Sequence, residues 1–170
     1  SNDEECVRES RGRELSFEEI RDLVLVPAKR LGTVAVGWSG GEFLLRQDAF
    51  DLLRLTAELG YRCNVCSNCE ILDRELLEEM KQAAGGKLTI SVGINSIDEG
   101  DEWSRNTEVD HTLEVLAICR ELGIDRHVII TIGKHNTDSF ERTVDYLVKR
   151  RISYNRSPLV ARGSGVGHFK

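Results

Sequence analysis

The residues best suited to chemistry are Gly40, Gly41 and Glu42, which follow a run of mostly apolar residues. That run, residues 33–38, is typical of a buried parallel strand, and such a strand delivers the loop after it to the sheet edge where ligands bind. Because glycine has no Cβ, the backbone N–H groups of this loop can approach a ligand closely. Glu42 adds a carboxylate. The sequence therefore predicts a ligand-binding loop, although most Gly-Gly-Glu triplets are ordinary tight turns.

Polar residues also follow or end the later strand-like runs, where the carboxyl ends of parallel strands would share one edge of a sheet. The candidate site residues in these positions are Ser67, Asn68, Ser91, Arg105 and Gly163.

Strand-like and helical patterns alternate along the chain. Strand-like runs begin near Thr33, Arg62, Leu88, His127 and Ile152, and helical patterns fill residues 48–59, 73–84, 108–122 and 138–148. Such alternation is typical of βαβ units and a parallel sheet. Five strands are fewer than the eight of a complete barrel. A helix also comes first, where a strand is expected. The sequence predicts a partial α/β barrel or an open sheet.

The helix ends carry recognisable signals. Ser16 and Glu19 form a capping box, Pro27 is expected to kink or interrupt the first helix, and Gly32 is expected to end it. The stripe expected to be buried on this helix is Ile20, Leu23, Val24 and Leu31. For the later helices the predicted N-caps are Asp48, Asp73 and Asp138, with a second capping box from Asp138 to Glu141, and the predicted stops are Gly60, Gly85 and Gly123.

Composition and charge exclude some classes of partner. The 170 residues are 40% apolar and 31% charged, as expected for one soluble domain. The net charge is −6 and no basic run occurs, which argues against nucleic acid held by phosphate contacts. No apolar segment approaches the roughly 20 residues that span a bilayer, so no membrane partner is predicted. Five cysteines, an odd number, favour a reducing compartment, the cytoplasm.

Three cysteines, Cys63, Cys66 and Cys69, have the spacing of iron–sulfur ligands. However, residues 62–68 have the pattern of a strand, in which Cys63 and Cys66 would point to opposite faces. Structural thiols are the preferred interpretation, because free cysteine is commonly a small buried apolar residue. A domain whose cysteines hold a metal is the alternative.

The order of motifs resembles the core domain of the radical S-adenosylmethionine (radical SAM) superfamily over about residues 14–165. The matching pieces are residues 39–42 with 44–46 and Asp48, Ser67 and Asn68 with Leu72 and Asp73, residues 90–92 with Arg105, Ile124 with residues 127–132 and Asn136, and Pro158 with Arg162 and Gly163.

This resemblance implies a partial (βα)6 TIM barrel that binds S-adenosylmethionine (SAM) and a [4Fe–4S] cluster. It also implies that SAM is cleaved to a 5′-deoxyadenosyl radical, which modifies a small-molecule, peptide or protein substrate. The electron would come from a donor such as flavodoxin or ferredoxin.

The resemblance also assigns roles to residues of the predicted site. Gly40, Gly41 and Glu42 would receive the amino group of SAM, and Ser67 and Asn68 would line the same cavity. Ser91 would lie by the ribose or carboxylate. Arg105 would pair with the carboxylate and Gly163 would approach the adenine.

The chain departs from the family at its N-terminus. The C-x3-C-x2-C cluster loop and the strand before it are missing, and only Cys6 lies where the last cluster ligand belongs. Residues 1–15 are therefore expected to be a poorly ordered remnant of the cluster-loop region, and residues 16–170 to form the core. The rival hypothesis is a non-catalytic α/β binding domain with structural or metal-holding cysteines.

Overall fold

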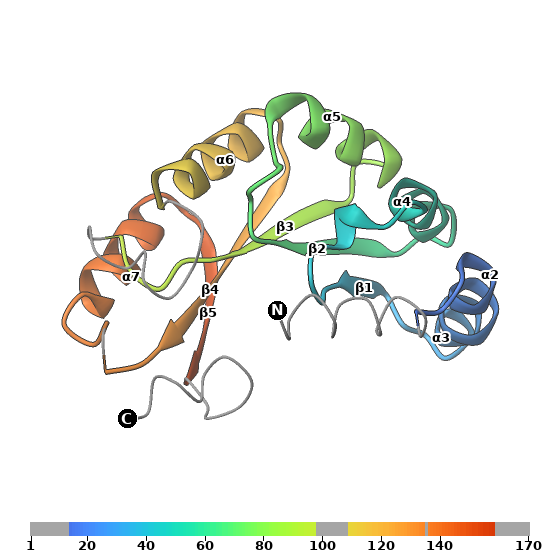
Figure 1. Ribbon diagram of the computed structural model, residues 1–170, viewed down its shortest axis with the longest axis horizontal. Helices are drawn as coiled ribbons and strands as arrows, with labels where there is room; N and C mark the ends of the chain where they lie inside the picture. Colours follow the sequence, from blue (N-terminus) through green and yellow to red (C-terminus); the bar gives the residue numbers. More distant parts are fainter. Residues whose placement is uncertain (1–13, 98–108, 135, 159–170) are drawn as a thin grey trace, which may run out of the picture.

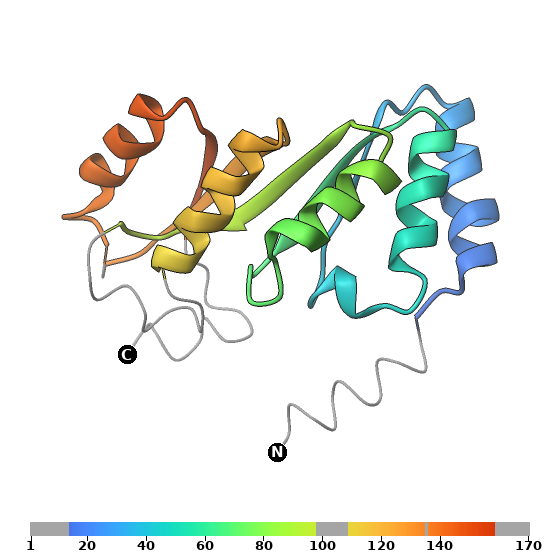
Figure 2. The same ribbon diagram turned by 90° about the horizontal axis from the view of Figure 1, so that it is seen from above.

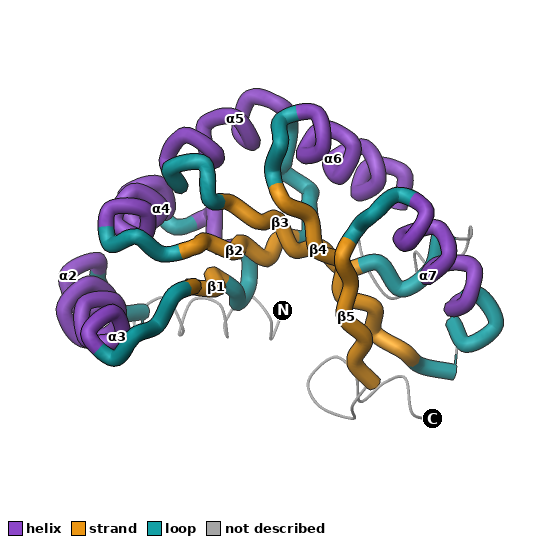
Figure 3. Tube along the Cα trace, turned by 180° about the vertical axis from the view of Figure 1, so that it is seen from behind, coloured by secondary structure: helices purple, strands orange, loops and turns teal. Residues whose placement is uncertain are grey.

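Five parallel strands form one sheet whose spatial order follows the order of the chain. The strands are β1 (Ala35–Trp38), β2 (Arg62–Ser67), β3 (Leu88–Gly93), β4 (Asp125–Ile132) and β5 (Ser153–Pro158). The sheet curls into an arch with helices outside it, as Figure 1 and, from behind, Figure 3 show. The predicted α/β partial barrel with parallel strands is confirmed.

The structure is a computed structural model, and it describes residues 14–97, 109–134 and 136–158. Three of the predicted site residues, Cys6, Arg105 and Gly163, lie outside the described residues. The expectation that residues 1–15 are poorly ordered falls almost wholly outside them as well. None of the helices in the described ranges is long and apolar enough to cross a lipid bilayer.

The helices lie on the convex side of the sheet. They are α2 (Phe17–Glu19), the π-helical η1 (Ile20–Leu25), α3 (Val26–Arg30), α4 (Ala49–Glu58), α5 (Arg74–Ala83), α6 (Val109–Glu121) and α7 (Phe140–Lys149). Figure 2 shows them side by side in chain order, from blue to orange. Their apolar stripes and one face of the strands form the core, in which Leu53, Leu77 and Val128 are fully buried.

Several predicted helix ends are confirmed. The Ser16 hydroxyl accepts a hydrogen bond from the Glu19 N–H, and the Glu19 carboxylate accepts one from the Ser16 N–H, which completes the capping box. The Asp73 carboxylate accepts from the Leu76 N–H at 2.8 Å. The glycines expected to end helices, Gly32, Gly60, Gly85 and Gly123, all have positive φ, the conformation that glycine adopts at helix C-termini.

The first helix differs from its predicted packing. Its middle, η1, is π-helical: the Val26 N–H donates to the Arg21 carbonyl five residues back, just before Pro27, which has no N–H to donate. The wider turn rotates the following side chains away from the positions that a 3.6-residue period assigns. Of the predicted stripe only Ile20 is buried, whereas Leu23, Val24 and Leu31 are exposed, and Leu25 is buried instead.

Two of the predicted N-caps differ from expectation. Asp48 occupies the N-cap position of α4 as predicted, but its side chain makes no capping hydrogen bond, because both its carboxylate oxygens bind the Arg46 guanidinium at 2.9 Å. At α7 the N-cap position is Ser139 rather than Asp138, so no capping box reaches Glu141. The Ser139 hydroxyl instead donates to the Asn136 carbonyl. In both places a nearby polar partner competes with the helix terminus.

This difference between Asp73 and Asp48 gives a stability prediction. Asp73→Ala removes the only side-chain cap of α5 and is expected to lower the free energy of unfolding by about 1 kcal/mol. Asp48→Ala removes an ion pair that is partly exposed and should cost less, about 0–1 kcal/mol. Urea denaturation of both variants and the parent measures the two values. Equal losses of unfolding free energy in the two variants would show that the Asp73 side chain does not stabilise α5 as a cap.

Candidate functional site

Glu42 joins the loop after β1 to the end of β2. Its Oε2 accepts hydrogen bonds from the Ser67 hydroxyl at 2.9 Å and from the Asn68 backbone N–H at 3.2 Å. The Ser67 oxygen in turn accepts from the Cys69 N–H at 3.1 Å. Three predicted site residues 25 and 26 positions apart in the chain are thus in direct contact.

The second carboxylate oxygen of Glu42 has no such partner. Oε1 is buried and makes no hydrogen bond with any of the described residues. A buried carboxylate oxygen without a donor is unusual, because buried polar atoms are nearly always hydrogen-bonded. The missing partner must be a hydrogen-bond donor, and a cationic donor such as an ammonium group also meets the negative charge. The site is therefore chemically suited to the amino group of an amino acid.

The two glycines before Glu42 differ in backbone conformation. Gly40 has a φ of +136°, which a residue with a side chain rarely adopts. Gly41 has no such backbone constraint, and a Cβ built on it would have no heavy atom within 4 Å. Open space thus lies beside Gly41, the residue before Glu42. A ligand can occupy that space.

A packed aromatic pair and an ion pair hold this loop. Trp38 at the end of β1 stacks on Phe43, with ring centroids 5.0 Å apart and planes at 17°. Phe43 is buried and begins η2, a 3-10 turn at Phe43–Leu45. The Arg46 guanidinium then binds Asp48 and, at 3.1 Å, Glu14. Trp38 thus serves packing in the core.

Strand β2 presents alternate residues to the two faces of the sheet. Cys63, Val65 and Ser67 are buried on the helix side, whereas Cys66 lies on the other, concave face and is partly exposed. The predicted opposite orientation of Cys63 and Cys66 is confirmed. Burial and the nearby Glu42 carboxylate both raise the pKa of the Cys66 thiol. Cys66 therefore lies beside the site. The sequence pattern predicted only a structural thiol here and did not predict this position.

Ser91 lies on the same concave face, one strand further on. It is paired in register with Cys66 and is almost fully buried. Its hydroxyl donates a hydrogen bond to Asn64 Oδ1 at 2.7 Å, so its oxygen remains available as an acceptor. The structure thus places Gly40, Gly41, Glu42, Ser67, Asn68 and Ser91 around the ends of β1, β2 and β3. Cys6, Arg105 and Gly163 remain predictions.

His111 on α6 is partly exposed but also contacts the site. Its Nε2 lies 3.0 Å from the carbonyl oxygen of Cys69, so it donates to the loop that carries Ser67 and Asn68. The contact joins residues 42 positions apart, which the periodicity of a single helix cannot indicate.

The alternative in which Cys63, Cys66 and Cys69 hold a metal has no geometric support. Cys63 and Cys69 are buried, and Cys66 faces the other side of the sheet from Cys63. Within residues 14–97, 109–134 and 136–158, no three His, Cys, Asp or Glu side chains converge as metal ligands. Burial raises the pKa of Cys63 to about 12, so at neutral pH this residue is a thiol and not the thiolate that metals bind.

Replacing all three cysteines tests this interpretation. The variant with Cys63, Cys66 and Cys69 changed to Ala should keep the iron and zinc content of the parent when both full-length proteins are prepared without oxygen. Its free energy of unfolding should fall by about 1–3 kcal/mol, because two of the removed thiols are packed in the core. Metal analysis and urea denaturation measure the two effects. Loss of stoichiometric metal from the variant alone would show that these cysteines are ligands.

Comparisons with known proteins agree with this geometry. The family model "Radical SAM superfamily" matches residues 3–147. Over 141 residues the chain is 30% identical to an Fe-coproporphyrin III synthase of Methanosarcina barkeri, covering 82% of this chain and 35% of that protein. Over 155 residues it is 25% identical to an AdoMet-dependent heme synthase of the same organism, covering 89% and 44%. The chain thus spans less than half the length of these curated relatives.

A solved structure shows the same fold. The crystal structure of Streptococcus suis SuiB bound to its precursor peptide SuiA superposes with a TM-score of 0.73 at 16% identity, over 87% of this chain and 34% of SuiB. Because the family model covers most of the chain and the strand ends carry the expected polar residues, the chain belongs to the radical SAM superfamily.

Proposed function

We propose that this chain is the SAM-binding core of a radical SAM enzyme. The observation that supports the proposal most directly is the buried Oε1 of Glu42, which has no hydrogen-bond partner among the described residues. The residue before it in the chain, Gly41, has open space at its Cβ position. The amino group of SAM would supply the missing cationic donor.

The other residues of the site hold Glu42 in place or border the same space. Ser67 and the Asn68 N–H fix Oε2, which leaves Oε1 free to accept from the ligand. Ser91 would accept a hydrogen bond from the ribose, since its own proton is already donated to Asn64. We also propose the carboxylate contact of Arg105 and the adenine contact of Gly163, which rest on the family resemblance alone.

The cluster belongs to the same proposal and rests on family membership. Cys6 would be one ligand of a [4Fe–4S] cluster, with residues 16–170 as the core. SAM and a reduced cluster, when bound, would supply 5′-deoxyadenosyl radical chemistry for hydrogen abstraction from the substrate. The electron would come from a flavodoxin or ferredoxin. A reducing location, the cytoplasm, fits this chemistry and the thiols at Cys63, Cys66 and Cys119.

For the substrate we propose an iron tetrapyrrole as the first class to test. The two archaeal relatives are named for Fe-coproporphyrin III synthesis and for heme synthesis, and the matched residues cover most of this chain. A peptide is the second class, because the structurally similar SuiB was solved with its precursor peptide.

The deciding experiment uses the full-length protein. After anaerobic reconstitution with iron and sulfide and reduction, incubation with SAM should release 5′-deoxyadenosine and methionine in equal amounts, measured by liquid chromatography. The same preparation without reductant is the control. A protein that takes up a [4Fe–4S] cluster, binds SAM and yet releases neither product under reduction would contradict the proposed activity.

A further inference from the structure

A row of four side chains crosses the concave face of the sheet. Cys66, Ser91, His127 and Ser153 are paired in register on β2, β3, β4 and β5. Adjacent strands are about 4.8 Å apart, so His127 lies roughly 10 Å from Cys66. The row therefore runs along the concave face from Cys66, beside the proposed SAM site, to the amino-terminal parts of β4 and β5, in which His127 is the third residue and Ser153 the first.

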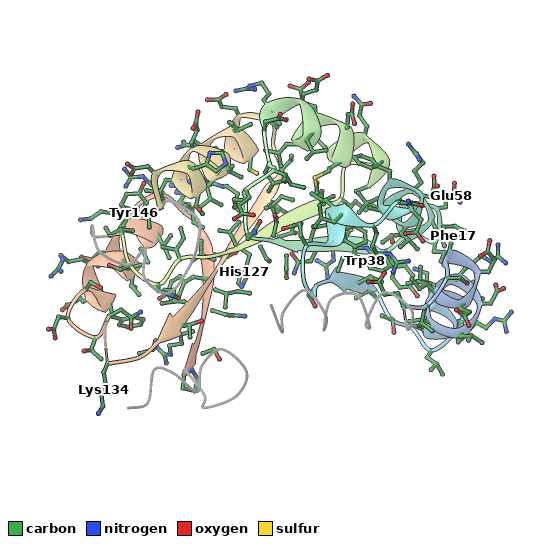
Figure 4. The ribbon with its side chains drawn as sticks, in the orientation of Figure 1. Phe17, Trp38, Glu58, His127, Lys134 and Tyr146 are labelled. Atoms are coloured by element: carbon green, nitrogen blue, oxygen red, sulfur yellow. The ribbon has the colours of Figure 1, made fainter. Side chains whose placement is uncertain are left out.

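His127 stands between two serines and faces away from the helices. The next residue, Val128, is fully buried on the helix side, and the alternation of a strand places His127 on the opposite face. Figure 4 shows His127 on the inner side of the arch. Its in-register neighbours, Ser91 and Ser153, are small, so the imidazole is the largest side chain of the row. A ligand lying over this row would therefore contact the imidazole before the three shorter side chains.

The hydrogen bonds of Ser153 determine which ring nitrogen of His127 carries the proton. The Ser153 hydroxyl donates to the Arg126 carbonyl at 2.8 Å, and a hydroxyl has one proton to donate. Its 3.0 Å contact with His127 Nδ1 must then be a hydrogen bond that Nδ1–H donates. Burial lowers the pKa of His127, which favours the neutral ring at pH 7. In this tautomer Nε2 carries a lone pair.

We propose that His127 Nε2 is an axial ligand to the iron of an iron tetrapyrrole substrate bound over the concave face. The proposal rests on the proposed substrate class. The Nε2 lone pair would form the bond to iron and displace a weakly held water, with no change in oxidation state. Ser153 would act as a positioning residue, because a hydrogen bond at Nδ1 fixes the tautomer and orientation of a metal-binding histidine and raises its basicity.

The bonding of the other histidine among the described residues supports this choice. His111 already uses its Nε2 to donate to the Cys69 carbonyl, so that nitrogen is not open to a metal. In His127, by contrast, Nδ1 is held by its hydrogen bond to Ser153, Nε2 carries the lone pair, and the residue lies on the concave face.

The test titrates ferric coproporphyrin III into the full-length protein and follows the Soret band. The parent should bind it with the spectrum of an imidazole-ligated iron. His127→Ala should lose that spectrum, and Ser153→Ala, which keeps the imidazole, should bind about ten- to a hundredfold more weakly. Glu79→Ala, at an exposed position on α5, is the control and should behave as the parent does. Circular dichroism of each variant verifies that it is folded.

Two results would overturn the proposal: a parent that does not bind ferric coproporphyrin III with an imidazole-type spectrum, or a folded His127→Ala variant with the parent's spectrum and affinity. SAM affinity and 5′-deoxyadenosine release, measured on the same preparations without tetrapyrrole, distinguish this failure from failure of the proposed function. If SAM is bound and cleaved normally while the tetrapyrrole is not ligated, only the role of His127 is wrong. If the tetrapyrrole is ligated while SAM is not cleaved, the proposed activity is wrong.

Discussion

Glu42→Gln is expected to weaken SAM binding by the full-length protein without weakening its fold. The change removes the charge that would meet the ammonium group, and a hydrogen bond to a charged group contributes about 1.5–3 kcal/mol, or roughly ten- to a hundredfold in affinity. The amide oxygen of Gln can still accept from Ser67 and Asn68. Its NH2 group would replace the buried Oε1 that has no hydrogen-bond partner among the described residues. The melting temperature should therefore stay the same or rise.

Isothermal titration with SAM and thermal unfolding without ligand measure the two effects. Glu70→Gln is the matched control, because Glu70 is exposed and contacts the site only through its backbone N–H, which donates to Asn68 Oδ1. A Glu42→Gln protein with the parent's SAM affinity, or one that loses stability as it loses affinity, would show that Glu42 serves the fold and not the ligand.

Gly41→Val is expected to have the largest effect on binding. A Cβ at Gly41 meets no heavy atom of the described residues within 4 Å, so the protein without ligand should keep its melting temperature. The same side chain would occupy the space beside Glu42 that the ligand needs. SAM affinity should fall by well over about tenfold, because both the room for the ligand and the approach to a backbone N–H are lost.

Gly40→Ala provides the contrast. At Gly40 the positive φ makes any side chain strained, so this variant should lose stability by about 1–3 kcal/mol even though its Cβ also meets no atom within 4 Å. Calorimetric titration and thermal unfolding of both variants separate the two effects. A Gly41→Val protein with unchanged SAM affinity would reduce Gly40, Gly41 and Glu42 to an ordinary turn.

The sequence predicted the order of elements well, because each strand and helix has a local cause. β2 and β3 begin at the residues expected from the pattern, Arg62 and Leu88, since an apolar run bounded by turn residues is a strong signal for a buried parallel strand. The glycine stops were also predictable, because few other residues tolerate positive φ.

Features that depend on competition between neighbours could not be predicted. Asp48 and Asp73 have the same residue type at the same position relative to a helix, yet only Asp73 is a cap, because Arg46 binds Asp48. The π-helical turn of η1 likewise changes which residues of the first helix are buried, and no periodicity signals it.

The candidate site was predictable in its location but not in its chemistry. Parallel topology alone indicates that Glu42 and Ser67 share one edge of the sheet. It does not indicate that Ser67 and Asn68 both bind the same carboxylate oxygen, nor that the other oxygen is buried with no partner in the described part of the chain. The sequence pattern placed His127 at the start of a strand. β4 begins two residues earlier, at Asp125, so His127 lies within the strand and its side chain projects from one face of the sheet.

The chain-ordered pairing of the strands has a consequence for how the protein is made. Each strand pairs with the strands before and after it in the chain, so no pairing waits for a distant segment. The contact of Glu42 with Ser67 and Asn68 needs only β1, α4 and β2. Domains begin to fold from the N-terminus while the ribosome is still adding residues. The contact of Glu42 with Ser67 and Asn68 is therefore able to form on the nascent chain before β3, β4 and β5 are synthesised.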